Sequence, residues 1–179
     1  MQEPRVPRPR SNIARIAARA VEACVLGARQ LELEDISDLP PEVIGPAGAF
    51  VCLKIGGELR GCIGTLQPTR PTVVEEIVVN AEGSCTRDPR FMPVKPDELP
   101  SLEVSVDVLS EPEPVKSEDE LDPKAYGVIV RSGPRVGLLL PDLEGVKDVA
   151  DQVSIARRKA GIKRCEPVDL FRFTVRRFD

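Results

Sequence analysis

The chain has 179 residues, of which 41% are hydrophobic and 30% charged, and its formal net charge is −4. This composition is typical of a globular protein with a substantial core. Only 3% of the residues are aromatic, and the acidic balance with so few stacking side chains argues against a nucleic-acid-binding protein. The chain has no histidine, which excludes a Ser-His-Asp triad, a Cys-His pair and any histidine-ligated metal site.

The N-terminal part predicts a tail followed by a helix. Residues 1–10 interleave arginine and proline, which predicts a disordered basic tail, with residues 11–179 as a single domain. Ser11 fits the N-cap of a helix whose apolar residues recur every three or four positions. This predicted stripe consists of Ile13, Ile16, Ala17, Ala20, Cys24, Ala28 and Leu31. Residues 32–48, rich in acids, proline and glycine, predict a connector.

The lengths of the apolar runs and the spacing of the cysteines indicate where the protein is located and whether it binds a metal. No run is long enough to cross a bilayer, and the N-terminus lacks the apolar stretch of a signal peptide, so we expect a cytoplasmic protein without membrane contact. The five cysteines are an odd number without a Cys-x-x-Cys pair, which argues against a secreted disulfide framework and against a Cys-ligated zinc. We predict neither a cofactor nor a metal.

The most unusual stretch of the sequence lies on a predicted hairpin. Residues 49–55 have the composition of a strand, and Gly56-Gly57 fits a two-residue turn. The return strand then carries Leu59-Arg60-Gly61-Cys62-Ile63-Gly64, a cysteine held between two glycines and two residues after an arginine. Glycine weakens a strand, so this motif indicates a special backbone shape or the close approach of another group.

The turn also predicts which residues face each other. A two-residue turn sets Cys52 opposite Gly61 and Val51 opposite Cys62. Because side chains alternate between the two faces of a sheet, Cys52 and Cys62 are then on opposite sides, and no disulfide is expected between them. Arg60 and Cys62 share one face in this register.

The middle of the chain predicts a second helix, a strand and a loop. The helix begins at Thr72 and places Val73, Ile77, Asn80 or Ala81, and Ser84 on one side. Residues 102–108 alternate apolar and polar side chains, which predicts a strand with one wet face. Residues 111–123, acidic and proline-bearing, predict an exposed excursion from the fold.

The last third predicts a second hairpin, a helix and a strand. Residues 126–131 and 135–141 form the two arms of the hairpin. The helix spans the apolar positions from Val146 to Ala160 and ends at Gly161. Residues 169–177 predict one final strand.

The chain resembles the AMMECR-type domain family over most of its length from about residue 49. The resemblance rests on Gly57–Gly64, Asp88–Phe91, Leu102–Leu109, Gly137–Pro141 and Lys159–Gly161. It implies an α+β fold, with a largely antiparallel sheet, flanking helices, and a main lobe plus a smaller lobe. It also implies that the Arg-Gly-Cys motif lines a surface cleft, although no reaction is assigned to the family.

The resemblance bears on partners as well. Prokaryotic members are named together with a Memo-type protein and a radical SAM enzyme as parts of one genomic system, which implies these two as partner proteins. Members often carry His-Gly where this chain has Tyr126-Gly127. Any role of that histidine cannot hold here.

Cys62 allows two interpretations. It could be a reactive thiolate activated by Arg60, with the backbone amides of Gly61 to Gly64 forming an anion-binding site. Proton transfer would then need a carboxylate such as Asp88 or Glu76, because imidazole is absent. Alternatively, Cys62 is a small apolar side chain, and the glycines allow a helix to pack closely.

The arginines also allow two interpretations. If Arg60, Arg87 and Arg90 converge beside Gly61 and Gly64, they would bind a small anionic ligand with a carboxylate or phosphate. Otherwise they are solvated side chains, one of them paired with Asp88. We therefore favour a non-catalytic binding or accessory module, with a small thiol- or arginine-dependent enzyme that acts on an anionic metabolite through Cys62 as the alternative.

Overall fold

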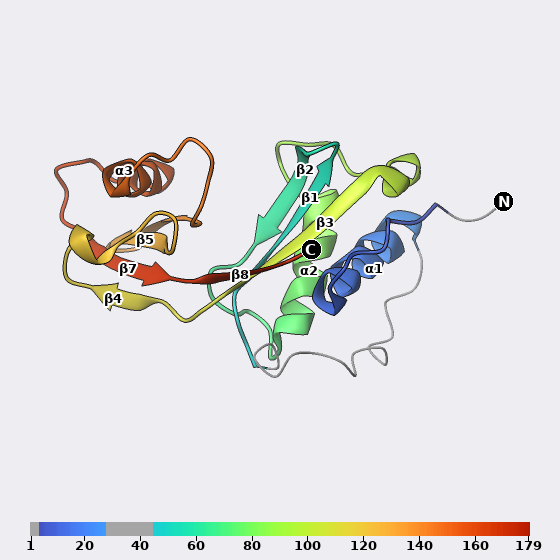
Figure 1. Ribbon diagram of the computed structural model, residues 1–179, viewed down its shortest axis with the longest axis horizontal. Helices are drawn as coiled ribbons and strands as arrows, with labels where there is room; N and C mark the ends of the chain where they lie inside the picture. The colour runs from blue at the N-terminus through green and yellow to red at the C-terminus, as the bar shows by residue number, and fades with distance from the viewer. Residues whose placement is uncertain (1–3, 28–44) are drawn as a thin grey trace. The chain divides into compact units, whose positions relative to one another are not determined.

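The computed structural model describes residues 4–27 and 45–179 (Figure 1). The chain divides into two compact units, residues 1–108 with 176–179 and residues 109–175. Each unit contains one four-stranded sheet and at least one helix. The antiparallel sheets with their helices confirm the predicted α+β class, with a main lobe and a smaller lobe. No helix in the described ranges is long and apolar enough to cross a membrane.

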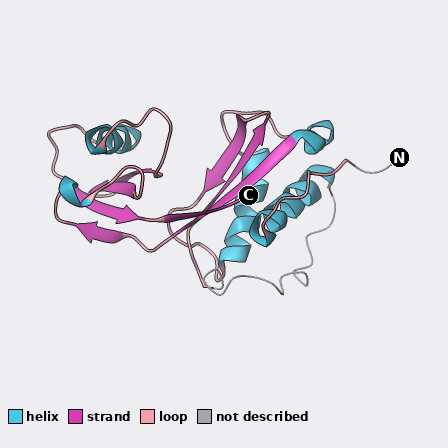
Figure 2. Ribbon diagram, in the orientation of Figure 1, coloured by secondary structure: helices cyan, strands magenta, loops and turns pink. Residues whose placement is uncertain are grey.

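Unit 1 is built on a sheet with the strand order β2-β1-β3-β8, which we call sheet A (Figure 2). The apolar sides of its strands and helices, including Val21, Val51 and Ile77, are fully buried in one core, as expected for helices packed on a sheet. The elements are α1 (Asn12–Leu26), β1 (Ala49–Ile55), β2 (Glu58–Gly64), α2 (Val73–Thr86), the 3₁₀ helix η3 (Pro96–Ser101), β3 (Leu102–Leu109) and β8 (Val175–Phe178).

The first helix begins where the sequence predicts and ends earlier. Ser11 is the N-cap, and its hydroxyl accepts a hydrogen bond of 3.1 Å from the Ala14 N–H. Gly27 ends the helix with a φ of +66°, a left-handed conformation that favours glycine. The predicted stripe positions 28 and 31, and most of the predicted connector, lie outside the described residues.

The described part of the N-terminal segment contacts this helix. Val6 is buried in the core of unit 1. Its N–H donates a hydrogen bond of 2.6 Å to Glu22 Oε1, and Arg15 donates to the carbonyl of Pro9 at 2.9 Å. Residues 4–10 therefore run along α1, while residues 1–3 lie outside the described part of the chain.

The second helix presents polar groups to the sheet as well as apolar ones. Asn80 Nδ2 donates to the Ala49 carbonyl at 2.9 Å, and Ser84 Oγ donates to the Val51 carbonyl at 2.7 Å. Both side chains are buried, and buried polar groups of this kind need such partners. The predicted helix face, from Val73 to Ser84, is therefore confirmed.

The hairpin has a different register from the predicted one. Gly56 and Gly57 form the turn, both with positive φ, and the first pairs are as predicted. The register then shifts, because Lys54 lies opposite Leu59 whereas Leu53 lies opposite Gly61. Arg60 is thus an extra residue without a partner on β1, which is a β-bulge.

The bulge reverses the prediction about the two cysteines. Cys52 lies directly opposite Cys62 with a Cα–Cα distance of 4.1 Å, and the two form a disulfide bond. The expectation that they lie on opposite sides of the sheet was wrong by one residue. A shift of one residue moves every following side chain to the other face.

Burial explains why the regular register is disfavoured. Leu53 is fully buried against the helices, so Arg60, if it were paired with Leu53, would point its charge into the same core. An unpaired buried charge is strongly destabilising. The bulge instead places Gly61 on that side, where its missing side chain leaves room for the Ser84 carbonyl oxygen of α2.

The predicted wet face of the 102–108 strand is only partly exposed. Glu103 is exposed, but Asp107 is buried and only 4% exposed. Arg177 of β8 donates two hydrogen bonds of 2.8 Å to the Asp107 carboxylate. The alternation in the sequence could not reveal this pairing, because the partner lies 70 residues later in the chain.

Unit 2 is built on a sheet with the order β4-β7-β5-β6, packed with one helix. The predicted second hairpin is confirmed. The predicted third helix is confirmed too, except that it begins at Val149 and not at Val146. The predicted exposed excursion is corrected in part, because residues 113–115 form a strand paired with β7 and Leu121 is buried. The elements are β4 (Glu113–Val115), the 3₁₀ helix η4 (Glu118–Glu120), β5 (Gly127–Ser132), β6 (Arg135–Leu139), α3 (Val149–Lys159) and β7 (Asp169–Phe173).

The predicted single last strand is two strands. β7 belongs to the sheet of unit 2 and β8 to sheet A, with a break at Thr174. Thr174 and Ser110 hold the break, since the Ser110 N–H donates to the Thr174 carbonyl and the Thr174 N–H donates to Ser110 Oγ, both at 3.0 Å. The alternating stretch over residues 169–177 thus contributes one strand to each of the two sheets.

Candidate functional site

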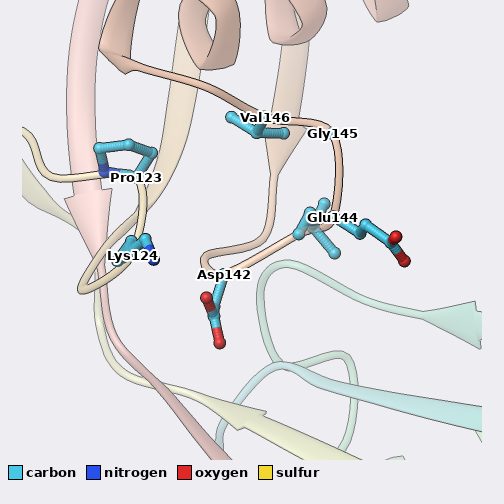
Figure 3. Close-up of a pocket in the computed structure, with 7 residues that line it drawn as sticks. Pro123, Lys124, Asp142, Glu144, Gly145 and Val146 are labelled. Carbon is cyan, nitrogen blue, oxygen red and sulfur yellow. The ribbon is translucent and has the colours of Figure 1, made fainter.

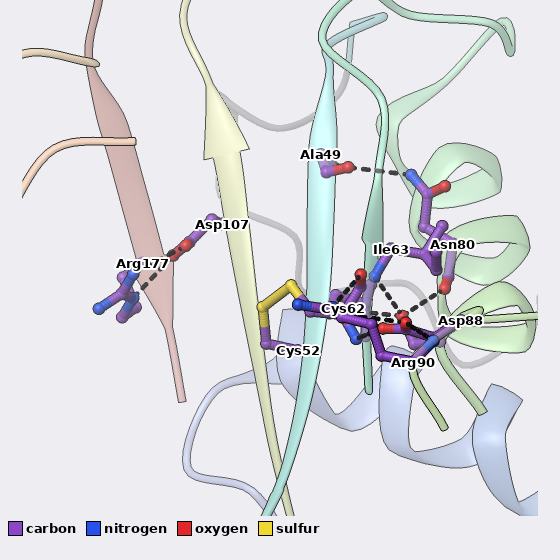
Figure 4. The surroundings of a disulfide bond; sticks show 11 residues. Ala49, Cys52, Cys62, Ile63, Asn80, Asp88, Arg90, Asp107 and Arg177 are labelled. Atoms are coloured by element: carbon purple, nitrogen blue, oxygen red, sulfur yellow. Dashed lines mark hydrogen bonds and ion pairs between the residues drawn. A yellow bond between two sulfur atoms is a disulfide. The ribbon is translucent and has the colours of Figure 1, made fainter. Parts of the chain in front are cut away.

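The segment after α2 folds back onto the edge strand β2 at Cys62. The Asp88 carboxylate accepts a hydrogen bond of 2.8 Å from the Cys62 N–H. The Arg90 side chain donates two hydrogen bonds to the same carboxylate, at 2.9 and 2.6 Å, and a third to the Cys62 carbonyl at 3.3 Å (Figure 4). The Arg90 backbone N–H also donates to this carboxylate, at 3.1 Å. The two side chains thereby satisfy both backbone groups of Cys62, which an edge strand would otherwise leave unpaired.

A phenylalanine joins this arrangement to Arg60. The guanidinium carbons of Arg60 and Arg90 lie 5.9 and 5.4 Å from the centre of the Phe91 ring, distances at which a cation interacts with an aromatic face. Arg60 also donates to both carboxylate oxygens of Glu98, at 2.7 and 3.0 Å. We call the group of Arg60, Cys62, Asp88, Arg90, Phe91 and Glu98 the Arg90 corner.

The carboxylates at the Arg90 corner are held in the charged form. The hydrogen bonds from Arg90 lower the pKa of Asp88 far below its ordinary value, although burial opposes the shift. The hydrogen bonds from Arg60 likewise lower the pKa of Glu98. A carboxylate that is so stabilised as an anion accepts a proton poorly near neutral pH.

Glu76, the other candidate for proton transfer, has a structural role. It is fully buried and accepts hydrogen bonds from the hydroxyls of Thr65 and Thr69 and from the N–H groups of Thr69 and Arg70. Burial raises the pKa of Glu76, but these hydrogen bonds outweigh burial and lower it overall. Glu76 thus holds the loop that follows β2.

Two backbone amides of the motif donate hydrogen bonds within the protein. The Cys62 N–H donates to Asp88 and the Ile63 N–H donates to Ser84 Oγ at 3.0 Å. Gly61 lies against the Ser84 carbonyl and Gly64 against the ring of Phe50, and a side chain at either glycine would overlap these groups. Both glycines therefore serve close packing.

The predicted site residues are brought together only in part. Arg60, Cys62, Asp88 and Arg90 meet at the Arg90 corner, and Cys62 is half-buried with its sulfur bonded to Cys52. The Arg87 side chain instead turns back along α2, where its Nη2 donates to the Val79 carbonyl at 3.4 Å. Cys62 therefore carries no free thiol in this form of the protein.

Two residues of the corner were missed as site residues. Phe91 directly follows Arg90 inside the Asp88–Phe91 motif, so its position in the motif was a usable signal. Glu98 follows 38 residues after its partner Arg60, and no spacing rule connects them. Only the folded chain reveals that pair.

A separate hollow lies in unit 2. It has a volume of about 360 Å³ and lies between residues 123–124 and residues 142–146 (Figure 3). None of the predicted site residues lines it. Within the described ranges, no three His, Cys, Asp or Glu side chains gather in a way that could hold a metal ion.

The sequence of this chain is similar to a family model and to proteins of other organisms. The model of the AMMECR1 family matches residues 14–178, which spans both units. A protein of Thermotoga maritima is 51% identical over 165 residues, covering 90% of this chain and 94% of that protein. A Clostridium acetobutylicum protein is 48% identical over 147 residues, and the match covers 81% of this chain but only 31% of that longer protein.

A solved structure has the same fold. The crystal structure of an uncharacterised protein from Pyrococcus horikoshii matches with a TM-score of 0.80 and 32% sequence identity, covering 92% of this chain and 88% of that one. The family model covers nearly the whole chain, and the motif residues of the Arg90 corner lie within the matched range. The chain therefore belongs to the AMMECR1 family, whose matched relatives are uncharacterised proteins.

Proposed function

We propose that the protein is a non-catalytic binding or accessory module, and that the Arg90 corner binds a carboxylate or phosphate group of a small anionic ligand or of a partner. The observation that carries this proposal is the state of Arg90. Its side chain is 54% exposed, and its Nη1 has no hydrogen-bond partner among residues 4–27 and 45–179.

The guanidinium is held in place before any ligand arrives. Asp88 fixes Nε and Nη2 of Arg90, and the Phe91 ring lies beside the guanidinium. A group that is already ordered loses less conformational entropy on binding. Guanidinium nitrogens also match the geometry of carboxylate and phosphate oxygens.

The enzyme alternative has less support. A nucleophilic role for Cys62 needs a free thiolate, which the disulfide-bonded form of the protein lacks. Asp88 as a general base needs an available carboxylate, whereas four hydrogen bonds from Arg90 and Cys62 hold it. A binding role requires neither group to react.

The family resemblance supports a cellular setting for this role. It implies a Memo-type protein and a radical SAM enzyme as partners of a cytoplasmic accessory protein. In that setting the anionic group could belong to a small metabolite or to a side chain of the partner. The two sources share the same chemistry at Arg90.

A thermal melting experiment tests the proposal. We would melt the full chain with inorganic phosphate, pyrophosphate or citrate, each against sodium chloride of equal ionic strength, because a ligand of the native state raises the melting temperature by mass action. At least one anion is expected to give a saturable rise.

Two variants make the test specific. Arg90→Gln is expected to weaken the apparent affinity at least about tenfold, the effect of losing one charge-assisted contact. Arg158→Gln, at an exposed position on α3, is the matched control and should bind as the unaltered chain does. Equal shifts in all three chains, or no saturable shift with any anion, would reject the proposal.

A further inference from the structure

We propose that Cys52 and Cys62 form a reversible redox site, which cycles between a disulfide and two thiols by exchange with an external dithiol. This inference does not depend on anion binding at the Arg90 corner. It rests on the position of the pair in the sheet, on the accessibility of the two residues and on the separation of this pair from the other cysteines.

The sheet holds the two residues opposite each other without the sulfur bond. β1 pairs along its whole length with β3, and β2 pairs with β1 on both sides of the cysteines. Ser84 Oγ accepts from the Ile63 N–H and donates to the Val51 carbonyl, so it ties the two strands together next to the pair. Reduction therefore leaves the two thiols in place to form the bond again.

The disulfide also adds little to the connectivity of the fold. It joins residues only 10 apart in sequence, and the glycine turn at residues 56–57 already closes that loop. A cross-link restricts the unfolded chain most when it closes a long loop. The position suits a bond that can open without unfolding the protein.

The pair is accessible on the face of sheet A that points away from the helices. Gly61, one residue before Cys62, lies against α2, and alternation puts Cys62 on the opposite face. Both cysteines are half-buried. In Figure 4 the disulfide lies in front of β1 and β3, α1 lies behind these strands and α2 lies beside β2. Cys85 differs, since it is buried on the helix side, beside Cys24.

The exchange is balanced in two steps. A thiolate of the external dithiol attacks one sulfur of the pair, which forms a mixed disulfide and releases the other cysteine as a thiolate. The second thiol of the reagent, after losing its proton, attacks the mixed disulfide and releases the first cysteine. The two protons of the reagent end on the two cysteine thiols, and the reagent leaves as a disulfide. The reverse steps, with an oxidised dithiol as the oxidant, restore the bond.

Thiol counting across a redox series tests the site. The full chain is equilibrated with mixtures of reduced and oxidised dithiothreitol, quenched with acid, unfolded, alkylated and weighed by mass spectrometry. The count is expected to rise from the three free cysteines of the structure to all five of the sequence, through one midpoint and equally in both directions. Far-UV circular dichroism should remain native throughout.

Two variants identify the residues. Cys52→Ser should give a constant thiol count in every mixture. Cys165→Ser, which removes an exposed free cysteine, is the matched control and should still gain two thiols on reduction. All thiols free in the most oxidising mixture, a redox change that persists in Cys52→Ser, or loss of native circular dichroism on reduction would each overturn the proposal.

Discussion

The carboxylate of Asp88 accepts a hydrogen bond of 2.8 Å from the backbone N–H of Cys62, which lies 26 residues earlier in the chain. This bond joins the segment after α2 to the edge strand of sheet A. Because Arg90 pairs with the same carboxylate, one buried side chain organises the whole Arg90 corner. A buried acceptor of this kind is costly to remove when its donors stay behind.

Asp88→Asn should therefore destabilise the protein. The amide carries no charge and can replace only part of the hydrogen bonding to Cys62 and Arg90, so we expect a loss of about 2 kcal/mol in the free energy of unfolding. Urea denaturation measures this loss. Asp97→Asn, at an exposed position, is the control and should change the value by less than about 0.5 kcal/mol. Equal effects of the two substitutions would contradict the assigned role.

The contribution of Asp88 should also depend on pH. Its pKa is lower in the folded chain than in the unfolded chain, so the folded state is favoured wherever the unfolded Asp88 is already ionised. This stability is fully present above about pH 4, the ordinary pKa of aspartate. It is lost as the pH falls through the lower pKa of the folded state.

Urea denaturation across an acid series checks this dependence. The difference in unfolding free energy between the unaltered chain and Asp88→Asn should be constant from neutral pH down to about pH 5 and shrink below about pH 4. Asp97→Asn should differ little from the unaltered chain at any pH. A difference that stays constant into strong acid would show that the charge of Asp88 contributes nothing.

Gly61→Ala should destabilise the contact between β2 and α2. A Cβ at this position would overlap the Ser84 carbonyl oxygen, which is backbone and cannot turn away. We expect a loss of about 1–3 kcal/mol, the usual cost of overpacking. Gly45→Ala is the matched control, because a Cβ there meets open space at an ordinary φ. Thermal melting of the two variants compares them, and a neutral Gly61→Ala would refute the close approach.

The free cysteines should differ widely in reactivity. Burial, and then the neighbouring Cys24, raise the pKa of the Cys85 thiol to about 12, whereas Cys165 is exposed. Alkylation requires the thiolate and access to it, so Cys85 should react at least about 100-fold more slowly than Cys165 in the native protein. Peptide mass spectrometry at timed intervals measures both rates. Comparable rates would mean that the interface between α1 and α2 opens readily.

Much of the fold follows from local sequence patterns. The N-cap at Ser11, the buried face of α2 and the glycine turn at residues 56–57 are as predicted. Each depends on residues a few positions apart, for which periodicity and turn chemistry are direct physical signals. The same holds for the strand over residues 102–108 and for the hairpin of unit 2.

The sequence predicted which residues of the two motifs belong to the candidate site, but not the contacts that these residues make. Arg60, Cys62, Asp88 and Arg90 were identified, and they meet in the folded chain. Their actual partners were not predictable. Glu98 pairs with Arg60 across 38 residues of sequence, a contact that no local pattern encodes, and the Arg87 side chain turns back to its own helix.

Sequence alone determined most of the helices and strands, because these depend on alternation, capping and turn residues within short segments. Its motifs indicated the family, and the resemblance to that family implied the α+β class. Tertiary structure decided the register of β2, and with it the disulfide between Cys52 and Cys62. The turn by itself allows either register. The folded protein has the bulged register, because this register places Gly61 against α2 beside the buried Leu53. The regular register would place the charged Arg60 there.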